Sequence, residues 1–252
     1  MLYKSECACN EFVHALNATV LALSIAVGTL AQTVDQPYAY PVKPGTPQWK
    51  ELDTHSQMIE ACRIPEDVLT DLSTKALVVT CLHYPLFGDM FAFNDFQLGF
   101  DRVKANFNGL QELLHREDVG KEALKAYKEM DDLGSPQSTD SDERWRYMYA
   151  EMLLSQAEVL GKMGEGQRKE LLRETLKKFE AKAARPQRYG PFNLTPSSLL
   201  MARLVRRKKK GKLPPAFLDQ TTREGRFAAK PFTLNREAIN SVAAAARAAL
   251  DI

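Results

Sequence analysis

The chain has 252 residues, of which 44% are hydrophobic and 26% are charged. These shares are ordinary for a folded globular protein and exclude disorder over the whole chain. The length admits one large domain or two small ones. The formal net charge of +2 at pH 7 is too small to indicate a polyanionic partner by itself, although basic residues gather between Arg203 and Lys230.

The first 31 residues have the pattern of an export signal. Lys4 precedes an uncharged, largely apolar stretch at 15–31 (ALNATVLALSIAVGTLA), which ends in small residues as a signal-peptidase site does. Glu6, His14 and Asn17 depart from that pattern, and the apolar core is shorter than the ~20 residues of a comfortable membrane span. We predict a short signal-like helix that is cleaved on export to the periplasm or the exterior. The alternatives are an uncleaved membrane anchor, a buried core helix and a wrongly chosen start codon.

Cysteine use depends on the same signal. Cys7 and Cys9 precede the apolar stretch and would leave with a cleaved signal, whereas Cys62 and Cys81 would remain. In an oxidising compartment the remaining two can form a disulfide. Each also falls on the apolar side of its predicted helix, where a thiol serves as a small hydrophobe. The sequence is therefore compatible with a Cys62–Cys81 disulfide and with two separate buried thiols.

Helical patterns begin after a linker. Residues 32–46 (QTVDQPYAYPVKPGT) are rich in Pro and Tyr, which predicts an extended, solvated linker. Pro47 marks the first turn of a helix. A short second helix follows Pro65, and Ser73 caps a third that stops before Pro85.

The most regular apolar spacing follows an aromatic turn. Residues 84–93 (YPLFGDMFAF) contain Pro and Gly and predict a buried turn between helices. A long helix is then expected from Asn94 or Asp95, because its large apolar residues recur at steps of four and three and form one stripe. These residues are Phe96, Phe100, Val103, Phe107, Leu110 and Leu114. Gly99 and Gly109 weaken this helix by about 1 kcal/mol each relative to Ala, and such glycines permit a neighbouring helix to approach closely.

The second half contains a helical hairpin and a different tail. A polar loop at 131–142 precedes predicted helices at 143–163 and 167–184, which a Gly-Glu-Gly turn joins into an antiparallel hairpin. We therefore predict a mainly α domain at 47–184, an irregular helical bundle or a loose stack of helical hairpins. Beyond it, prolines break residues 185–252 into a basic tail with short helices, expected at Pro196–Arg207 with Thr195 as its cap and at Asn235–Leu250.

Three segments between residues 64 and 127 carry a resemblance to other proteins. Between Ile64 and Tyr127 stand the segments IPEDVL, YPLFGDMFAFN and FNGLQELLHRED. On these segments, the chain resembles a group of uncharacterised secreted bacterial helical proteins. The resemblance implies export and a helical fold, and it brings no known activity or binding residues.

Catalytic and metal motifs are missing from the sequence. The four histidines (His14, His55, His83 and His115) do not have the H-E-x-x-H spacing of a zinc site. The acidic loop at 131–142 has the wrong residue order for a calcium loop. We therefore predict no catalytic, cofactor-binding or metal-ligating residue and no cofactor, and the sequence favours a role other than catalysis. An unrecognised enzyme remains the alternative, with a pocket near 81–93 that uses Cys81, His83 and Asp89.

A dense basic run is the remaining signal. It contains six cations, at Arg206, Arg207, Lys208, Lys209, Lys210 and Lys212. Anionic lipid headgroups contribute about 1 kcal/mol per cation near a membrane surface. Nucleic acid is the less favoured partner, because no stacking aromatic residues alternate with the cations. A solvated helix end without a specific partner explains the run as well.

Taken together, these patterns predict an extracytoplasmic helical protein with a binding or scaffold role toward a protein partner. The first alternative is an anionic-surface binder that uses residues 206–212, and the second is the enzyme with a pocket near 81–93.

Overall fold

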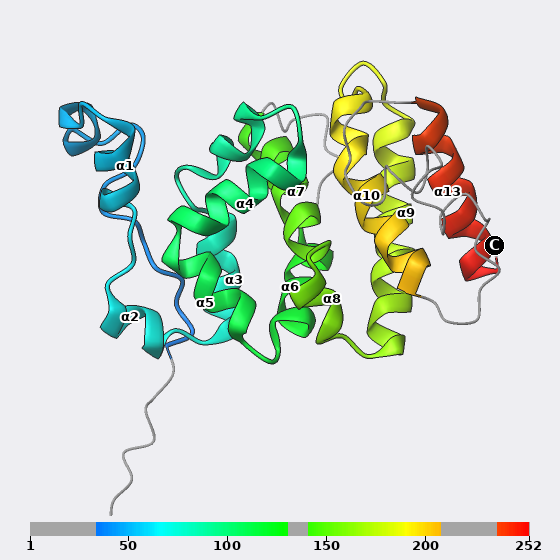
Figure 1. The fold of residues 1–252 in the computed structure, drawn as a ribbon, viewed down its shortest axis with the longest axis horizontal. Coiled ribbons are helices and arrows are strands. Elements are labelled where there is room, and N and C mark those ends of the chain that lie inside the picture. Colours follow the sequence, from blue (N-terminus) through cyan, green and yellow to red (C-terminus); the bar gives the residue numbers. More distant parts are fainter. Residues whose placement is uncertain (1–33, 131–140, 208–235, 252) are drawn as a thin grey trace, which may run out of the picture. The chain divides into compact units, whose positions relative to one another are not determined.

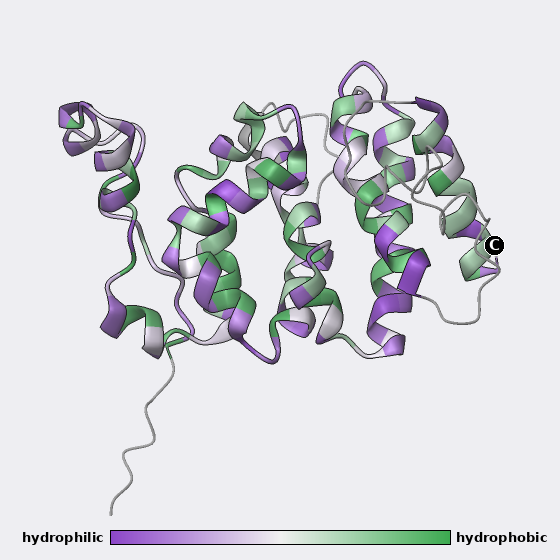
Figure 2. Ribbon diagram, viewed as in Figure 1, coloured by the Kyte–Doolittle hydropathy of each residue, from purple (hydrophilic) through white to green (hydrophobic). Residues whose placement is uncertain are grey.

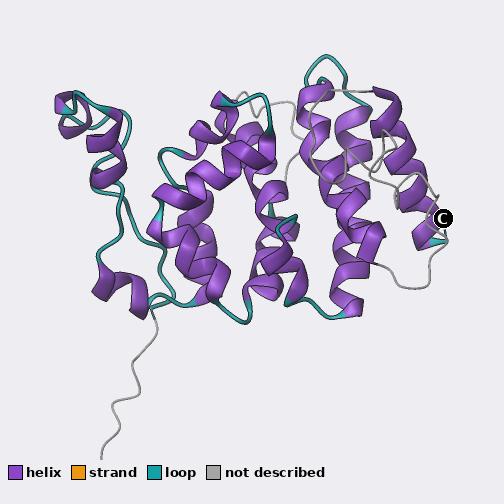
Figure 3. Cartoon of the chain, viewed as in Figure 1, coloured by secondary structure: helices purple, strands orange, loops and turns teal. Residues whose placement is uncertain are grey.

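The computed structural model describes residues 34–130, 141–207 and 236–251. Within these ranges the fold is mainly α, as the sequence predicts, with one isolated parallel bridge between Val34 and Leu72 (Figures 1 and 3). The elements are η1 (Gln48–Glu51), α1 (His55–Ala61), α2 (Glu66–Asp71), α3 (Thr74–Leu82), η2 (Phe87–Ala92), α4 (Phe96–Asn106), α5 (Asn108–His115), α6 (Val119–Glu129), α7 (Ser141–Leu154), α8 (Ala157–Gly161), α9 (Glu165–Ala183), α10 (Pro191–Arg207) and α13 (Arg236–Leu250). The predicted signal at 1–31 and the cations from Lys208 to Lys212 lie outside the described residues.

The segment expected to be a solvated linker is instead docked on α3. Tyr40 is buried, and its hydroxyl donates a hydrogen bond to the Thr80 carbonyl at 3.2 Å. The Tyr38 amide donates to the Thr80 hydroxyl at 2.9 Å. Tyr40 also lies in an aromatic group with Tyr84 and Phe107, at centroid distances of 6.2 and 6.5 Å. The tyrosines that made this segment look like an exposed linker therefore attach it to the core.

The helix expected after Pro47 is divided by a local cap. The chain forms a short 3-10 turn, η1, and then restarts as α1. Thr54 is the reason, because its hydroxyl accepts the Gln57 amide while the Gln57 side chain accepts the Thr54 amide, a reciprocal capping box. The predicted cap at Ser73 is confirmed, since its hydroxyl accepts the Ala76 amide at the start of α3.

The long helix predicted from Asp95 starts there but breaks in the middle. The Asp95 side chain accepts the amides of Gln97 and Leu98 in the first turn of α4, and the chain is extended at Phe107 before α5 begins. The break follows from tertiary contacts. The Phe107 ring stacks on Tyr84 at 3.9 Å between centroids, and Asn108 forms hydrogen bonds with both the amide and the carbonyl of Ile64. The predicted single stripe is therefore two shorter helices.

Gly99 supports the expected close approach of a neighbouring element. A Cβ atom built at this position would lie 2.0 Å from the backbone oxygen of Met90 in η2. No side chain larger than hydrogen fits there without a backbone shift. The glycine thus holds α4 against the 3-10 turn that precedes it.

The second predicted long helix is also divided. α7 ends at Leu154, and α8 begins at Ala157. Gln156 stands between them in an extended conformation, and its side-chain amide donates to the Met152 carbonyl at 2.6 Å, close to the end of α7. Ser155 likewise donates to the Met152 carbonyl. Two polar side chains therefore terminate α7.

The described parts of residues 185–252 are not a tail, which corrects the predicted boundary at 184. α10 packs against α7, α9 and α13, and α13 also packs against α9 (Figure 1). Leu199, Leu200 and Met201 are completely buried. Both hydrophobic and hydrophilic residues occur along α13 (Figure 2), and its small buried alanines let it lie close to its neighbours. Thr195, predicted to be a helix cap, lies inside α10 instead and donates to the Pro191 carbonyl.

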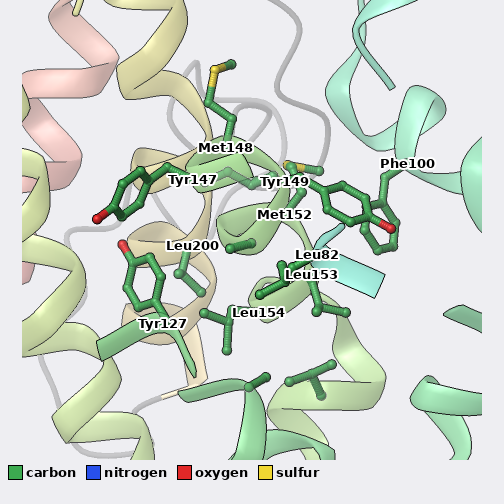
Figure 4. Packing of buried hydrophobic residues seen from close by; sticks show 14 of the residues in the cluster. Leu82, Phe100, Tyr127, Tyr147, Met148, Tyr149, Met152, Leu153, Leu154 and Leu200 are labelled. Atoms are coloured by element: carbon green, nitrogen blue, oxygen red, sulfur yellow. The ribbon is translucent and has the colours of Figure 1, made fainter. Parts of the chain in front are cut away.

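The core is continuous around α7. Figure 4 shows Tyr147 and Tyr149 on opposite sides of this helix, with Tyr149 near Phe100 and Tyr147 near Tyr127. Met148, Met152 and Leu153 of the same helix are also buried. α7 is thus surrounded by other elements, which explains why its sequence carries large apolar groups on more than one face. None of the helices in the described ranges is both long and apolar enough to span a membrane.

Candidate functional site

Cys62 and Cys81, the two cysteines in the described residues, are free thiols, so they do not form the disulfide that the sequence left open. Both are buried, as small hydrophobic groups are. Burial raises the pKa of Cys62 to about 11 and raises that of Cys81 well above its ordinary value. Because the thiolate is the nucleophile, both groups are held in their unreactive form near neutral pH.

The residues of the alternative enzyme site have separate surroundings. Cys81 is buried in α3, whereas His83 is exposed and its Nδ1 lies 2.8 Å from the Val79 carbonyl. Asp89 forms an ion pair with His55 at 2.9 Å. These contacts account for each polar group without a shared reaction centre.

A polar centre that the sequence did not predict lies between four helices. Glu151 of α7 and Lys182 of α9 form an ion pair at 2.6 Å, and both side chains are at most 1% exposed. Ser197 of α10 and Tyr127 of α6 donate to the same oxygen of Glu151, at 2.8 and 2.9 Å. Lys182 also donates to the Ser197 hydroxyl at 3.0 Å. Complete burial leaves no route for a substrate, so we assign this centre to the architecture.

A polar pocket lies one to two helical turns beyond this centre along α7 and α10. Its volume is about 680 Å³, within the range of small-molecule sites. α4 contributes to one wall, the break between α7 and α8 to the second, and the end of α10 to the third. The lining consists of Gln97, Asp101, Lys104, Ser155, Gln156, Ala157, Glu158, Leu160, Arg203, Arg206 and Arg207.

Arg203 is the central cation of this pocket. One terminal nitrogen donates to the carbonyl and to the hydroxyl of Ser155, at 3.1 and 3.0 Å, and the other donates to Oε1 of Gln97 at 2.9 Å. Its guanidinium has no ion pair with any described residue. Burial lowers the pKa of Arg203 to about 10, and Arg206 adds to that shift. The carboxylates of Asp101, Asp95 and Glu158 oppose it from beyond ion-pair distance. Arg203 is therefore a cation that neutral groups hold in place, and it retains unused N–H donors.

Gln97 is fixed by contacts on both ends of its amide. Its oxygen accepts Arg203, while its nitrogen donates to Asp101 at 2.8 Å and to Gln156 at 3.0 Å. This chain of contacts joins α4, the α7–α8 break and α10, so the pocket walls are positioned before any ligand enters. Such preorganisation lowers the entropic cost of binding.

The other charged side chains of the lining differ in whether they already have a partner. Lys104 and Glu158 form an ion pair at 2.6 Å, and that hydrogen bond lowers the pKa of Glu158. Arg207 has only a long contact, 3.5 Å, to the Ala157 carbonyl. For Arg206, the described part of the chain supplies no hydrogen-bond or ion-pair partner. Three guanidinium groups and Asp101 therefore remain to interact with a ligand.

The structure thus places the first two residues of the predicted basic run in this pocket, and Lys208, Lys209, Lys210 and Lys212 lie outside the described residues. Sequence reasoning missed Arg203, Gln97 and Gln156. One signal was present, because Arg203 interrupts an otherwise apolar helical stretch, LLMARLV. In the described residues no group of His, Cys, Asp and Glu is arranged to hold a metal ion.

Comparisons with protein-family models, with curated proteins and with solved structures find no match. The resemblance of residues 64–127 to secreted bacterial proteins therefore stays a prediction.

Proposed function

We propose that this protein is a binding protein that holds an anionic ligand in the pocket formed by α4, the α7–α8 break and α10. The observation that carries the proposal is Arg203, a half-buried guanidinium without an ion-pair partner among the described residues. A charge removed from water is normally paired, because its desolvation is costly. An anion in the pocket would supply the missing partner, with Arg206 and Arg207 beside it.

Binding is favoured over catalysis by the kinds of side chain in the lining. Its described residues include neither His nor Cys, and the Ser155 hydroxyl is already engaged with Met152 and Arg203. A nucleophile needs an adjacent base to become reactive, and Ser155 has a cation next to it instead. This favours the binding role expected from the sequence, with an anion rather than a whole surface as the partner.

Titration with inorganic phosphate tests the proposal. We expect the double variant Arg206→Ser, Arg207→Ser to bind phosphate about tenfold more weakly, a loss of about 1.4 kcal/mol. The matched control is Lys169→Ser, Arg173→Ser, which removes two exposed cations from α9 outside the pocket. Binding should weaken as salt increases, because salt screens charges on the rim. Equal phosphate affinity in the two double variants would contradict the proposal.

We also propose that the protein acts outside the cytoplasm. Support comes from the apolar stretch at 15–31 and from the resemblance of residues 64–127 to secreted proteins. Mass spectrometry of the mature N-terminus tests this, with cleavage after Ala31 as the expected result. Full-length chain found only in the cytoplasm would reject it, while leaving the pocket proposal to its own experiment.

A further inference from the structure

We infer that the ligand of this pocket is a phosphorylated polyol, whose phosphate faces the three arginines and whose hydroxyl groups face Asp101 and the amides of Gln97 and Gln156. The inference rests on the proposed anion-binding function and adds the chemical class of the ligand. It comes from the unequal distribution of charge, acceptors and apolar surface in the lining.

The cationic wall matches a dianion better than a carboxylate. Lys104 and Glu158 neutralise each other, so the other charged residues of the described lining, three arginines and one aspartate, leave a net charge of +2. A phosphomonoester carries between about −1.5 and −2 charges at pH 7 and offers three strong acceptor oxygens. Guanidinium groups suit such oxygens because their N–H donors lie in a rigid planar fork.

Arg203 has the donors that this arrangement requires. Its contacts to Ser155 and Gln97 use three of the five N–H groups of a guanidinium. Arg206 supplies further donors from the adjacent turn of α10. Because Arg203 is held by α4 and by the α7–α8 break, its fork does not need to be ordered when the phosphate arrives.

The opposite wall is rich in acceptors. One oxygen of Asp101 accepts Gln97, and the described part of the chain supplies no partner for the other. The side-chain oxygen of Gln156 accepts Gln97 while its nitrogen is committed to Met152, so this oxygen is directed by the fold and keeps a second acceptor position. Acceptors fixed in this way suit hydroxyl groups, which donate, and they disfavour a second anionic group.

The lining also disfavours a nucleotide or an acyl chain. Ala157 and Leu160 are its only aliphatic residues among the described lining, which contains no aromatic ring. A nucleobase usually finds a stacking partner, and an acyl chain needs extensive apolar surface. The volume of about 680 Å³ leaves room for a sugar-sized body beside the phosphate, whereas inorganic phosphate alone fills only a part.

Isothermal titration of the full chain with a set of matched compounds tests the inference. The probes are glucose 6-phosphate, inorganic phosphate, glucose and adenosine monophosphate. We expect glucose 6-phosphate to bind about tenfold more tightly than phosphate, glucose to bind far more weakly, and the nucleotide to gain nothing over phosphate. In Asp101→Asn the advantage of glucose 6-phosphate over phosphate should decrease severalfold, because one acceptor becomes a donor.

Two failures can be told apart. If phosphate binds and glucose 6-phosphate binds no more tightly, or the nucleotide binds best, the polyol inference is overturned and the anion-binding function stands. If no anion binds, the function itself fails. A binding assay with vesicles that contain phosphatidylinositol 4-phosphate distinguishes a lipid headgroup from a free ligand. Vesicle binding that glucose 6-phosphate displaces supports the same chemistry on a lipid, and vesicle binding that it does not displace contradicts the inference.

Discussion

Two polar sites lie along α7 and α10, and their central cations have opposite surroundings. In the centre between α6, α7, α9 and α10, Lys182 meets Oε1 of Glu151 at 2.6 Å, and two hydroxyl groups donate to the same oxygen. Among the described residues, Oε2 of Glu151 has no hydrogen-bond partner. Further along α7 and α10, Arg203 meets only the neutral groups of Ser155 and Gln97. The first cation is fully enclosed, and the second faces a pocket that also contains the half-buried Arg206 and the exposed Arg207.

The difference shows how a helical fold separates architecture from binding. A charge that the chain itself pairs can be enclosed completely and helps to fix which helices pack together. A charge that the chain leaves without an opposite partner must remain in reach of water or of a ligand. The stability of the protein should therefore depend mainly on the Glu151 centre, and its binding on the Arg203 pocket.

The largest expected effect is loss of stability on breaking the enclosed pair. Lys182→Met leaves the Glu151 carboxylate buried without its cation, which typically costs about 3–5 kcal/mol. Urea unfolding followed by circular dichroism measures the free energy of unfolding. A double variant, Glu151→Leu with Lys182→Met, removes both charges and should recover much of the loss. If the single variant loses less than Arg203→Met does, the assignment of the two sites to stability and to binding is wrong.

A smaller effect in the same centre tests its hydrogen bonds. Tyr127→Phe removes the hydroxyl that donates to Glu151 at 2.9 Å while keeping the ring. Hydrogen bonds to charged groups contribute about 1.5–3 kcal/mol, so the free energy of unfolding should decrease by that order. The same urea titration measures it, with an unchanged midpoint as the contradicting result. Phosphate affinity should stay the same, because Tyr127 does not line the pocket.

Local signals in the sequence predicted most of the fold. The cap at Ser73, the start of a helix at Asp95 and the short helix after Pro65 depend on residues within a few positions, and all three are present. The prediction that the long helices are continuous was wrong, because the residues that break them are distant in the sequence. The break before Asn108 depends on Ile64, which is 44 residues away, and the break at Gln156 is held by Gln97, 59 residues away.

The candidate site was predictable only in part for the same physical reason. The density of cations after Arg206 drew attention to the right end of α10. Arg203 became informative only once its neighbours Ser155 and Gln97 were placed beside it by the packing of α7 and α4. The sequence of an apolar helix with a single cation does not show whether a neighbouring helix supplies a carboxylate to pair with that cation.

A moderate effect on stability and a large effect on binding are expected at the pocket cation. Arg203→Met removes three hydrogen bonds, each worth about 0.5–1.5 kcal/mol, but it also removes a cation that is only partly solvated. The groups left behind can bind water in the pocket, so we expect a net loss of about 1 kcal/mol in urea unfolding. Phosphate binding by calorimetry should disappear. Retained phosphate affinity in this variant would remove Arg203 from the site.

The smallest effect concerns the ion pair at the edge of the same pocket. The hydrogen bond from Lys104 holds the pKa of Glu158 below its ordinary value of 4.5. A depressed folded-state pKa stabilises the protein above the ordinary carboxyl pKa, and that stabilisation is lost as pH falls through the folded-state pKa. Because both side chains are more than one third exposed, the contribution should be only about 0.2–1 kcal/mol. Glu158→Gln should therefore lower stability slightly at pH 7, and its difference from the parent protein should shrink as the pH falls below 4.5 and through the folded-state pKa. Thermal unfolding across this pH range measures the difference, and a gap that does not change with pH would show that the ion pair is not its source.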